Sequence, residues 1–204
     1  MNAALIVIAK APLPGRSKTR LSPPLTLEVA ARLAEAALRD TLACVAEVAA
    51  ARRVVALDGE PGDWLPAGFE VVPQRGNGLD ERLAAAFEEV GEPAVLIGMD
   101  TPQLRPALLR QALERLERAD AVLGPALDGG YWAIGLREPQ RELFTGVPMS
   151  SRETCRAQLA RLAAHGLSVT LLPQLRDVDL FDDARAVARL APRSRFASAL
   201  AAAA

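Results

Sequence analysis

Histidine and cysteine are scarce in this chain, which limits the metal and redox chemistry it can perform. Among 204 residues there is one histidine, His165, and there are two cysteines, Cys44 and Cys155, far apart and outside any Cys-x-x-Cys pattern. No zinc site can be assembled from this set, and the cysteines are expected to be reduced, partly buried thiols. His165 precedes Gly166, where helix capping or solvent contact is favoured over catalysis.

Aromatic residues and net charge are also low. Phe, Trp and Tyr make up 4% of the residues, and the formal net charge is −1. A nucleic-acid partner is therefore not expected, although a local basic cluster can still bind an anion. Half of the residues are hydrophobic, dominated by alanine and leucine. This mixture favours helices packed on a sheet over an all-β sandwich.

Long apolar runs are missing as well. The apolar stretch at residues 5–9 is far too short to span a membrane, and no basic region precedes it and no cleavage signal follows it. We therefore expect a cytoplasmic protein without a membrane partner. The sequence leaves the oligomeric state open and allows a homodimer.

Short apolar segments alternate with amphipathic ones along the chain. Helices are expected at residues 28–48, 79–90, from Pro106 onward, from an N-cap at Ser150 to Ala164, and at 181–190. Strands are expected at residues 3–9, 53–57, 69–72, 94–99, 121–123, 131–136 and 168–172. This pattern predicts a three-layer α/β/α sandwich with a mostly parallel mixed sheet. We expect one domain over residues 1–192 and a frayed tail over 193–204.

Ligands of such sheets bind beyond the carboxyl ends of the strands, which directs attention to the loops there. The loop after the first strand, residues 10–24, lacks both the Walker and the Gly-x-Gly-x-x-Gly patterns. It does carry four cations and a glycine that lets the backbone bend around a ligand: Lys10, Arg16, Lys18, Arg20 and Gly15. This loop, called the basic loop below, is either a cradle for a polyphosphate or a solvated basic surface.

Carboxylates stand at two further points of the same sheet edge. Asp100 follows the most apolar predicted strand, and Asp177 and Asp179 lie between the last strand and the helix that follows it. Hard cations such as Mg²⁺ and Mn²⁺ prefer carboxylate and phosphate oxygens. The alternatives are an Asx turn at Asp100 and N-capping by the later pair. We predict that Asp100 and Asp179 approach each other and share a divalent ion.

Two glycine-containing segments complete the candidate site. Gln74–Leu79 leaves a predicted strand and carries Gly76 and Gly78, so it could line a base pocket or form a surface turn. Gln74 could both donate and accept hydrogen bonds there. Gly124–Tyr131 joins two strands through Asp128, Gly129 and Gly130, as a ligand-bordering turn or as a plain hairpin-like turn.

Taken together, these segments resemble a known bacterial family. The segments are residues 9–12, 14–21, 96–102, 124–131 and 175–179, and they occur in the same order over nearly the whole chain. The chain is similar to the bacterial glycosyltransferase-like family of unknown function often found beside radical-SAM genes. That family is related to phospholactate guanylyltransferases and molybdenum-cofactor nucleotidyltransferases.

The resemblance implies a fold and a set of roles. It implies the GT-A fold of the nucleotide-diphospho-sugar transferases, with Mg²⁺ or Mn²⁺ held by Asp100 and Asp179. Lys18 and Arg20 would hold a triphosphate and take part in catalysis together with Asp100. The nucleotide would also contact Lys10, Gly15, Arg16, Gln74, Gly76, Gly78, Leu79 and Arg82. The acceptor would lie beside Asp128, Gly129, Gly130 and Tyr131.

Three functions remain open from the sequence. The first is transfer of a nucleotidyl group from a nucleoside triphosphate to a small phosphorylated acceptor, with release of pyrophosphate. The second is glycosyl transfer from a nucleotide sugar, and the third is nucleotide binding without catalysis. The three cations Arg16, Lys18 and Arg20 exceed what a diphosphate leaving group needs, and therefore favour nucleotidyl transfer.

Overall fold

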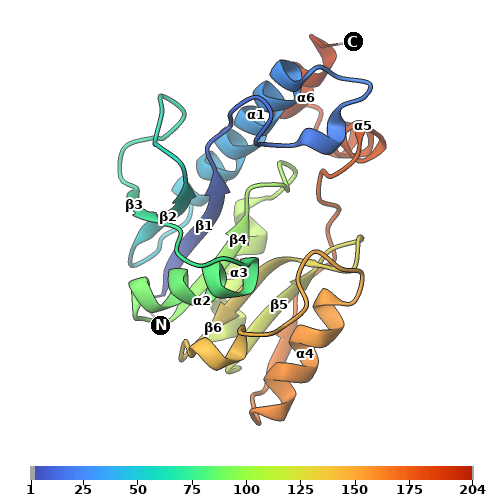
Figure 1. Cartoon of the computed structure of the whole chain (residues 1–204). Coiled ribbons are helices and arrows are strands. Elements are labelled where there is room, and N and C mark those ends of the chain that lie inside the picture. The colour runs from blue at the N-terminus through green and yellow to red at the C-terminus, as the bar shows by residue number, and fades with distance from the viewer. Residues whose placement is uncertain (1–2, 204) are drawn as a thin grey trace.

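The fold is built around a mixed β-sheet. The computed structural model describes residues 3–203, and in this part of the chain seven strands pair in the order β3-β2-β1-β4-β6-β5-β7 (Figure 1). The strands are β1 (Ala4–Lys10), β2 (Arg53–Asp58), β3 (Glu70–Pro73), β4 (Ala94–Gly98), β5 (Ala121–Pro125), β6 (Tyr131–Leu136) and β7 (Val169–Leu171). Only β6 runs antiparallel to its neighbours β4 and β5; every other pairing within these residues is parallel. The predicted mostly parallel mixed sheet is confirmed.

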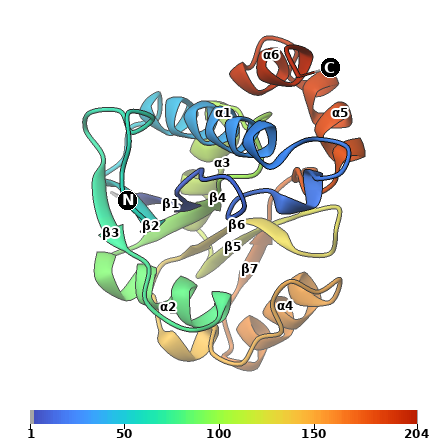
Figure 2. The same ribbon diagram turned by 45° about the horizontal axis from the view of Figure 1, so that its top comes forward.

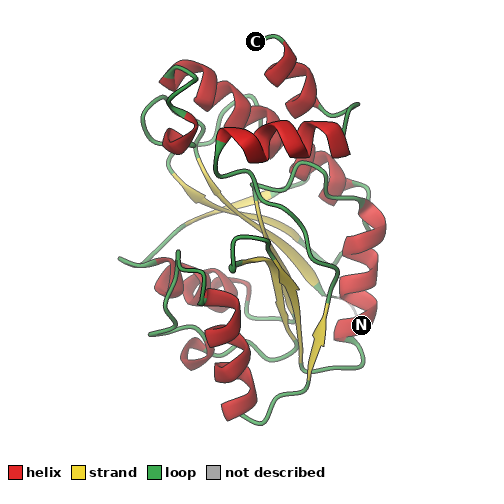
Figure 3. Ribbon diagram, turned by 90° about the vertical axis from the view of Figure 1, so that its right-hand side faces the viewer, coloured by secondary structure: helices red, strands yellow, loops and turns green. Residues whose placement is uncertain are grey.

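Helices cover both faces of this sheet. They are α1 (Leu27–Ala46), α2 (Leu79–Val90), α3 (Pro106–Leu116), α4 (Thr154–Ala164), α5 (Phe181–Leu190) and α6 (Arg195–Ala201), with 3-10 turns at Thr19–Leu21 and Arg141–Leu143. α1 and α3 lie on one side and α2 and α4 on the other, as Figure 2 shows. Seen from the side, the strands run between the two layers of helices (Figure 3). None of the helices described is long and apolar enough to cross a membrane.

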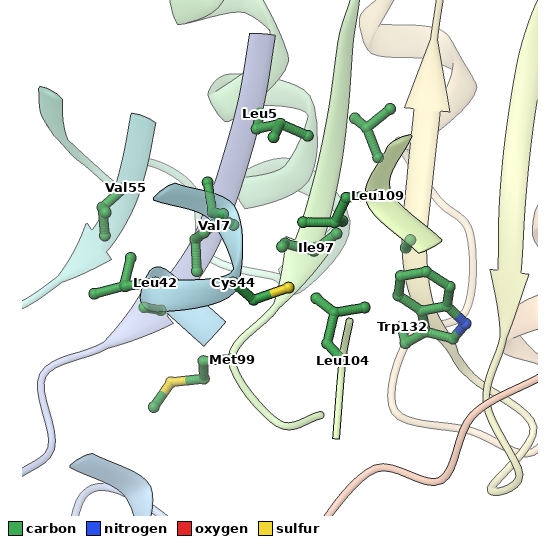
Figure 4. Close-up of a cluster of buried hydrophobic side chains, with 14 of the residues drawn as sticks. Leu5, Val7, Leu42, Cys44, Val55, Ile97, Met99, Leu104, Leu109 and Trp132 are labelled. Atoms are coloured by element: carbon green, nitrogen blue, oxygen red, sulfur yellow. The ribbon is translucent and has the colours of Figure 1, made fainter. Parts of the chain in front are cut away.

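The alternation of side chains along the central strands explains these layers. Leu5 and Val7 of β1 join the core under α1 and α3, part of which Figure 4 shows, whereas Ala4 and Ile6 join the core under α2. A strand buried on both faces needs apolar residues at every position, because successive side chains point to opposite sides. The continuous apolar run at the start of the chain is thus accounted for.

The predicted start of α4 is wrong. Ser150 does not cap the helix: its φ is 54°, and the helix begins at Thr154. The Thr154 hydroxyl donates to the Pro148 carbonyl and accepts the amide of Ser151, which holds a turn ahead of the helix. A serine in the left-handed conformation cannot offer the extended backbone that an N-cap needs.

The predicted frayed tail over 193–204 is also wrong for the residues described. Ser194 caps α6 by accepting the amide of Ala197, and Asp40 of α1 accepts the amides of Arg195 and Phe196. Phe196 is fully buried in a third core cluster, together with Leu21 of the basic loop and Val178. A buried aromatic ring and three capped amides therefore hold this short helix, although alanine content alone suggested a loose end.

We expect Phe196→Ala to lower the free energy of unfolding by about 3–5 kcal/mol, because it empties a closed apolar site. Urea denaturation followed by circular dichroism measures this. Leu190→Ala is the matched control, since Leu190 is 59% exposed and its removal should change stability by less than about 0.5 kcal/mol. Equal stabilities for the two variants would mean that α6 does not pack as described.

Candidate active site

A cleft of about 590 Å³ opens at the carboxyl ends of β1 and β4. Its floor is formed by strand residues such as Ile8 and Gly98, and its walls by the basic loop, the start of α2 and one end of β6. Ten of the predicted site residues line it: Lys10, Arg16, Lys18, Arg20, Gln74, Leu79, Arg82, Asp100, Tyr131 and Asp179. Gly15, Gly76, Gly78, Asp128, Gly129 and Gly130 are not in the lining and shape the backbone around it.

The structure brings the two predicted metal ligands to the same edge. The amide of Val178 donates to the backbone carbonyl of Asp100 at 2.9 Å, which ties the segment between Asp177 and Asp179 to the end of β4. Each carboxylate is neutralised by a cation of the basic loop. Lys18 Nζ lies 2.8 Å from Asp100 Oδ1, and Arg20 Nη1 lies 2.7 Å from Asp179 Oδ2.

The donor set suits a metal that shares its coordination with a substrate. Among residues 3–203 no group of three or more His, Cys, Asp and Glu side chains is arranged to hold an ion by itself. Asp100 and Asp179 can supply two carboxylates at the cleft, with phosphate oxygens and water completing the shell. Mg²⁺ is commonly bound in this way, through one or two carboxylates and the phosphates of its substrate.

Asp177 is an acidic neighbour that the predicted site does not include. Its pKa is raised to about 6, mainly because the carboxyl is partly buried and next because Asp128 lies near it. Lys18 opposes this shift, and Asp100 adds to it. Asp100, Asp128 and Asp177 thus lie close enough beside the cleft to influence one another's ionisation.

Local hydrogen bonds give the basic loop its shape. The backbone carbonyl of Leu13 accepts hydrogen bonds from the backbone amides of Arg16 and Ser17. The buried Ser17 hydroxyl donates to the Ala11 carbonyl at 2.9 Å. Lys18 then takes a left-handed conformation with φ 53°, and its ammonium donates to the Val178 carbonyl as well as to Asp100. Non-glycine residues seldom adopt this conformation, and such strain concentrates at functional sites.

Asp58 is a residue beside the cleft that the sequence did not reveal. It ends β2 and pairs with two cleft arginines, Arg16 at 3.5 Å and Arg82 at 2.9 Å. Arg82 also donates from Nε to the Gly76 carbonyl. Gly76 has φ 119°, and a Cβ there would lie 2.5 Å from the Glu81 Cβ, so the turn next to Arg82 requires glycine.

The expected role of Gln74 in reading a base needs correction. Its side-chain amide already donates to the carbonyls of Ala9 and Ala56, at 2.8 and 2.9 Å, and its oxygen accepts from Arg82. Both amide hydrogens are therefore committed to the ends of β1 and β2 and are not free for a base edge. Gln74 holds the floor of the cleft and orients Arg82.

Gln74→Ala should therefore lower the free energy of unfolding by about 1–3 kcal/mol, because two carbonyls lose their donors. Affinity for the nucleotide that the family resemblance implies should fall by the same factor for every base. Thermal unfolding and competition among the four nucleoside triphosphates measure the two effects, with the exposed Gln140→Ala as control. A change of base preference without loss of stability would restore the base-reading role.

The predicted acceptor turn contributes mainly through its backbone. Asp128 accepts the Gly130 amide at 2.7 Å, and a Cβ on Gly129 would lie 2.2 Å from the Arg152 carbonyl oxygen. The turn thus supports the neighbouring loop at Arg152 through close backbone contact. Tyr131 alone of the four residues lines the cleft, and its hydroxyl is turned to Gln158 at 3.2 Å. Burial raises the pKa of Tyr131.

Comparisons with known proteins agree with this architecture. A crystal structure from Desulfovibrio desulfuricans G20, whose name places it among the nucleotide-diphospho-sugar transferases, superposes with a TM-score of 0.89 at 27% identity, covering 98% of this chain and 94% of that one. A 2-C-methyl-D-erythritol 4-phosphate cytidylyltransferase from Thermus thermophilus shares the fold, with a TM-score of 0.57 at 18% identity over 94% of this chain and 100% of that one. The expected nucleotide-diphospho-sugar transferase fold is confirmed.

Sequence comparison points the same way. A 2-phospho-L-lactate guanylyltransferase from Methanocaldococcus infernus is 28% identical over 117 residues, which are 55% of this chain and 52% of that protein. The chain thus spans about half the length of this curated relative. The model of a bacterial family matches residues 29–151, well over half of the 204 residues. The chain belongs to that family, which is described as uncharacterized protein conserved in bacteria (DUF2064).

Proposed function

We propose that this protein is a metal-dependent nucleotidyltransferase. The observation that carries the proposal is the charge of the cleft, where five cationic side chains surround two carboxylates. The cations are Lys10, Arg16, Lys18, Arg20 and Arg82. Two carboxylates suit one Mg²⁺ or Mn²⁺. The five cations still outnumber these two carboxylates and the neighbouring Asp58, which pairs with Arg16 and Arg82. The excess positive charge fits a nucleoside triphosphate, whose three phosphates bring more negative charge than a nucleotide sugar does.

In the proposed reaction an acceptor oxygen attacks the α-phosphorus. The bond from that phosphorus to the bridging oxygen breaks, and pyrophosphate leaves. Asp100 and Asp179 would hold the divalent ion, which would supply charge neutralisation at the phosphates. Lys18 and Arg20 neutralise the negative charge that grows on the leaving pyrophosphate, while Arg16 and Arg82 position the nucleotide. No protein nucleophile is required.

Two walls of the cleft would receive the base and the acceptor. The named guanylyltransferase relative makes GTP the first triphosphate to test. Asn77 and Leu79, at the start of α2, are the proposed neighbours of the base, since both line the cleft and Gln74 is engaged elsewhere. A small acceptor, phosphorylated as in the named relatives, is proposed to enter beside Tyr131 and Ser150 on the opposite wall.

Glycosyl transfer is the second candidate, favoured by the name of the Desulfovibrio structure. One experiment separates the two. Pyrophosphate release is measured from each of the four nucleoside triphosphates with a panel of phosphorylated acceptors and Mg²⁺ or Mn²⁺. In parallel, nucleoside diphosphate release is measured from nucleotide sugars with the same acceptors. Release of only a nucleoside diphosphate, with no pyrophosphate from any triphosphate, would reject nucleotidyl transfer.

A further inference from the structure

Asp58 stands between the two parts of the cleft wall that the proposed function assigns to the nucleotide. Its backbone carbonyl accepts the amide of Ala11 at the start of the basic loop, at 2.9 Å. The next residue, Gly59, packs so closely there that a Cβ would lie 2.7 Å from the Ala11 Cβ. On the other side, the backbone amide of Gln74 donates to the Leu57 carbonyl at 2.9 Å. The position of Asp58 is therefore set by the sheet rather than by its own side chain.

Its two carboxylate oxygens are divided between two arginines. Oδ1 lies 3.5 Å from Arg16 Nη2, and Oδ2 lies 2.9 Å from Arg82 Nη1. Arg16 belongs to the basic loop and Arg82 to α2, and both line the cleft, whereas Asp58 does not. One carboxylate at the end of β2 thus joins the phosphate side of the site to the side nearest the base.

The remaining contacts of Arg82 show what this arrangement leaves for a ligand. Arg82 Nε donates to Gly76, and Nη1 donates to Gln74 at 3.4 Å as well as to Asp58. Within residues 3–203, Nη2 has no hydrogen-bond partner, so this end of the guanidinium can donate to a ligand. An arginine side chain loses substantial rotational entropy when it is ordered, and prior ordering removes that cost from binding.

We propose that Asp58 is a positioning residue for nucleotide binding. This inference rests on the proposed function. Asp58 fixes the Arg16 and Arg82 guanidinium groups and offsets their mutual repulsion, so that both meet the nucleotide in a set geometry. It acts through these arginines and touches neither the nucleotide nor the metal. Nucleotide affinity therefore depends on Asp58, while affinity for the metal alone does not.

The test compares Asp58→Asn with Glu70→Gln. Glu70 pairs with Arg52 through both oxygens, at 3.0 and 2.7 Å, on the exposed strand β3 outside the cleft. Both substitutions thus replace a carboxylate facing arginine by an amide. Calorimetric titration with GTP in the presence of Mn²⁺ should show about tenfold weaker binding to Asp58→Asn and unchanged binding to Glu70→Gln. Mn²⁺ titration without nucleotide should give the wild-type constant for both, and Asp58→Glu should recover part of the loss.

Two further measurements separate positioning from direct contact. In a double-mutant cycle, Asp58→Asn should cost much less when Arg16 and Arg82 are already glutamine. An undiminished cost in that background would overturn the proposal. If Asp58 bound the ribose 2′-hydroxyl directly, Asp58→Asn would weaken binding of GTP but leave binding of 2′-deoxy-GTP unchanged. That result would also overturn the proposal. If Asp58→Asn loses the native melting transition, the cycle is run with Asp58→Glu, which keeps the charge but displaces it.

Failure of the inference is distinguishable from failure of the proposed function. If wild-type protein binds GTP but Asp58→Asn binds it equally well, only the role of Asp58 is rejected. If wild-type protein binds none of the four nucleoside triphosphates with Mn²⁺, the proposed function fails, and this inference fails with it.

Discussion

Asp100→Asn should weaken Mn²⁺ binding, and with it metal-dependent binding of GTP, by more than about 100-fold. Substitutions of groups that only orient metal ligands already cost 10- to 100-fold in comparable sites, and Asp100 is proposed as a direct ligand. The fold should be retained, because the side chain is 41% exposed and its structural hydrogen bond to Val178 uses the backbone carbonyl. Free Mn²⁺ is measured by electron paramagnetic resonance, with and without GTP.

Asp182→Asn is the matched control for this experiment. Asp182 lies three residues after Asp179, in the first turn of α5, and is exposed outside the cleft. The Asp182→Asn substitution should leave Mn²⁺ and GTP binding unchanged. If Asp100→Asn bound Mn²⁺ and GTP as tightly as the wild-type protein, Asp100 would not be a metal ligand. The proposed site shared by Asp100 and Asp179 would then be rejected.

Lys18→Ala should lower kcat by about 100-fold or more while changing KM for the nucleotide only slightly. The charge that Lys18 meets grows on the leaving pyrophosphate in the transition state, and loss of one such contact typically costs 100- to 1000-fold in kcat. Steady-state pyrophosphate release with varied GTP measures both constants. Lys18→Arg, which keeps the charge, should recover part of the rate.

The ion pair between Lys18 and Asp100 adds a second expected effect of opposite direction. The lysine is only 11% exposed and neutralises the carboxylate at 2.8 Å. A divalent ion must displace or share that interaction, so Lys18→Ala should strengthen binding of Mn²⁺ alone even as it slows turnover. A rise in KM with kcat unchanged, together with weaker Mn²⁺ binding, would instead make Lys18 a ground-state binding residue.

Much of the sheet could be predicted because its determinants are local. The run from Leu5 to Ala9 is apolar at every position, and only a strand covered on both faces tolerates that. Asp100 follows the equally apolar β4, and parallel strands end at a common edge. The cations Arg16, Lys18 and Arg20 lie in the loop after β1, so their arrival at the same sheet edge as Asp100 follows from the shared direction of parallel strands.

Other parts of the site could not be predicted, because their determinants join residues far apart in the chain. Asp58 forms ion pairs with Arg16, 42 positions away in the sequence, and with Arg82, 24 positions away. No spacing pattern in the sequence predicts such pairs. The donors of Gln74 were predicted to face a base, but their nearest acceptors turn out to be the carbonyls of two neighbouring strands. A polar side chain pairs with whichever group the fold places beside it.

The sequence by itself determined the alternation of strands and helices, the sheet edge at which the candidate site lies, and the cations and carboxylates gathered there. All of these depend on the order of residues within one element and the loop that follows it. Only the tertiary structure decided that Asp58 pairs with two arginines and that Asp40 and the buried Phe196 hold residues 195–201 as a helix. It also decided that Lys18 and Arg20 pair with Asp100 and Asp179. Each of these depends on contacts between distant segments, whose distances the packing of helices on the sheet sets.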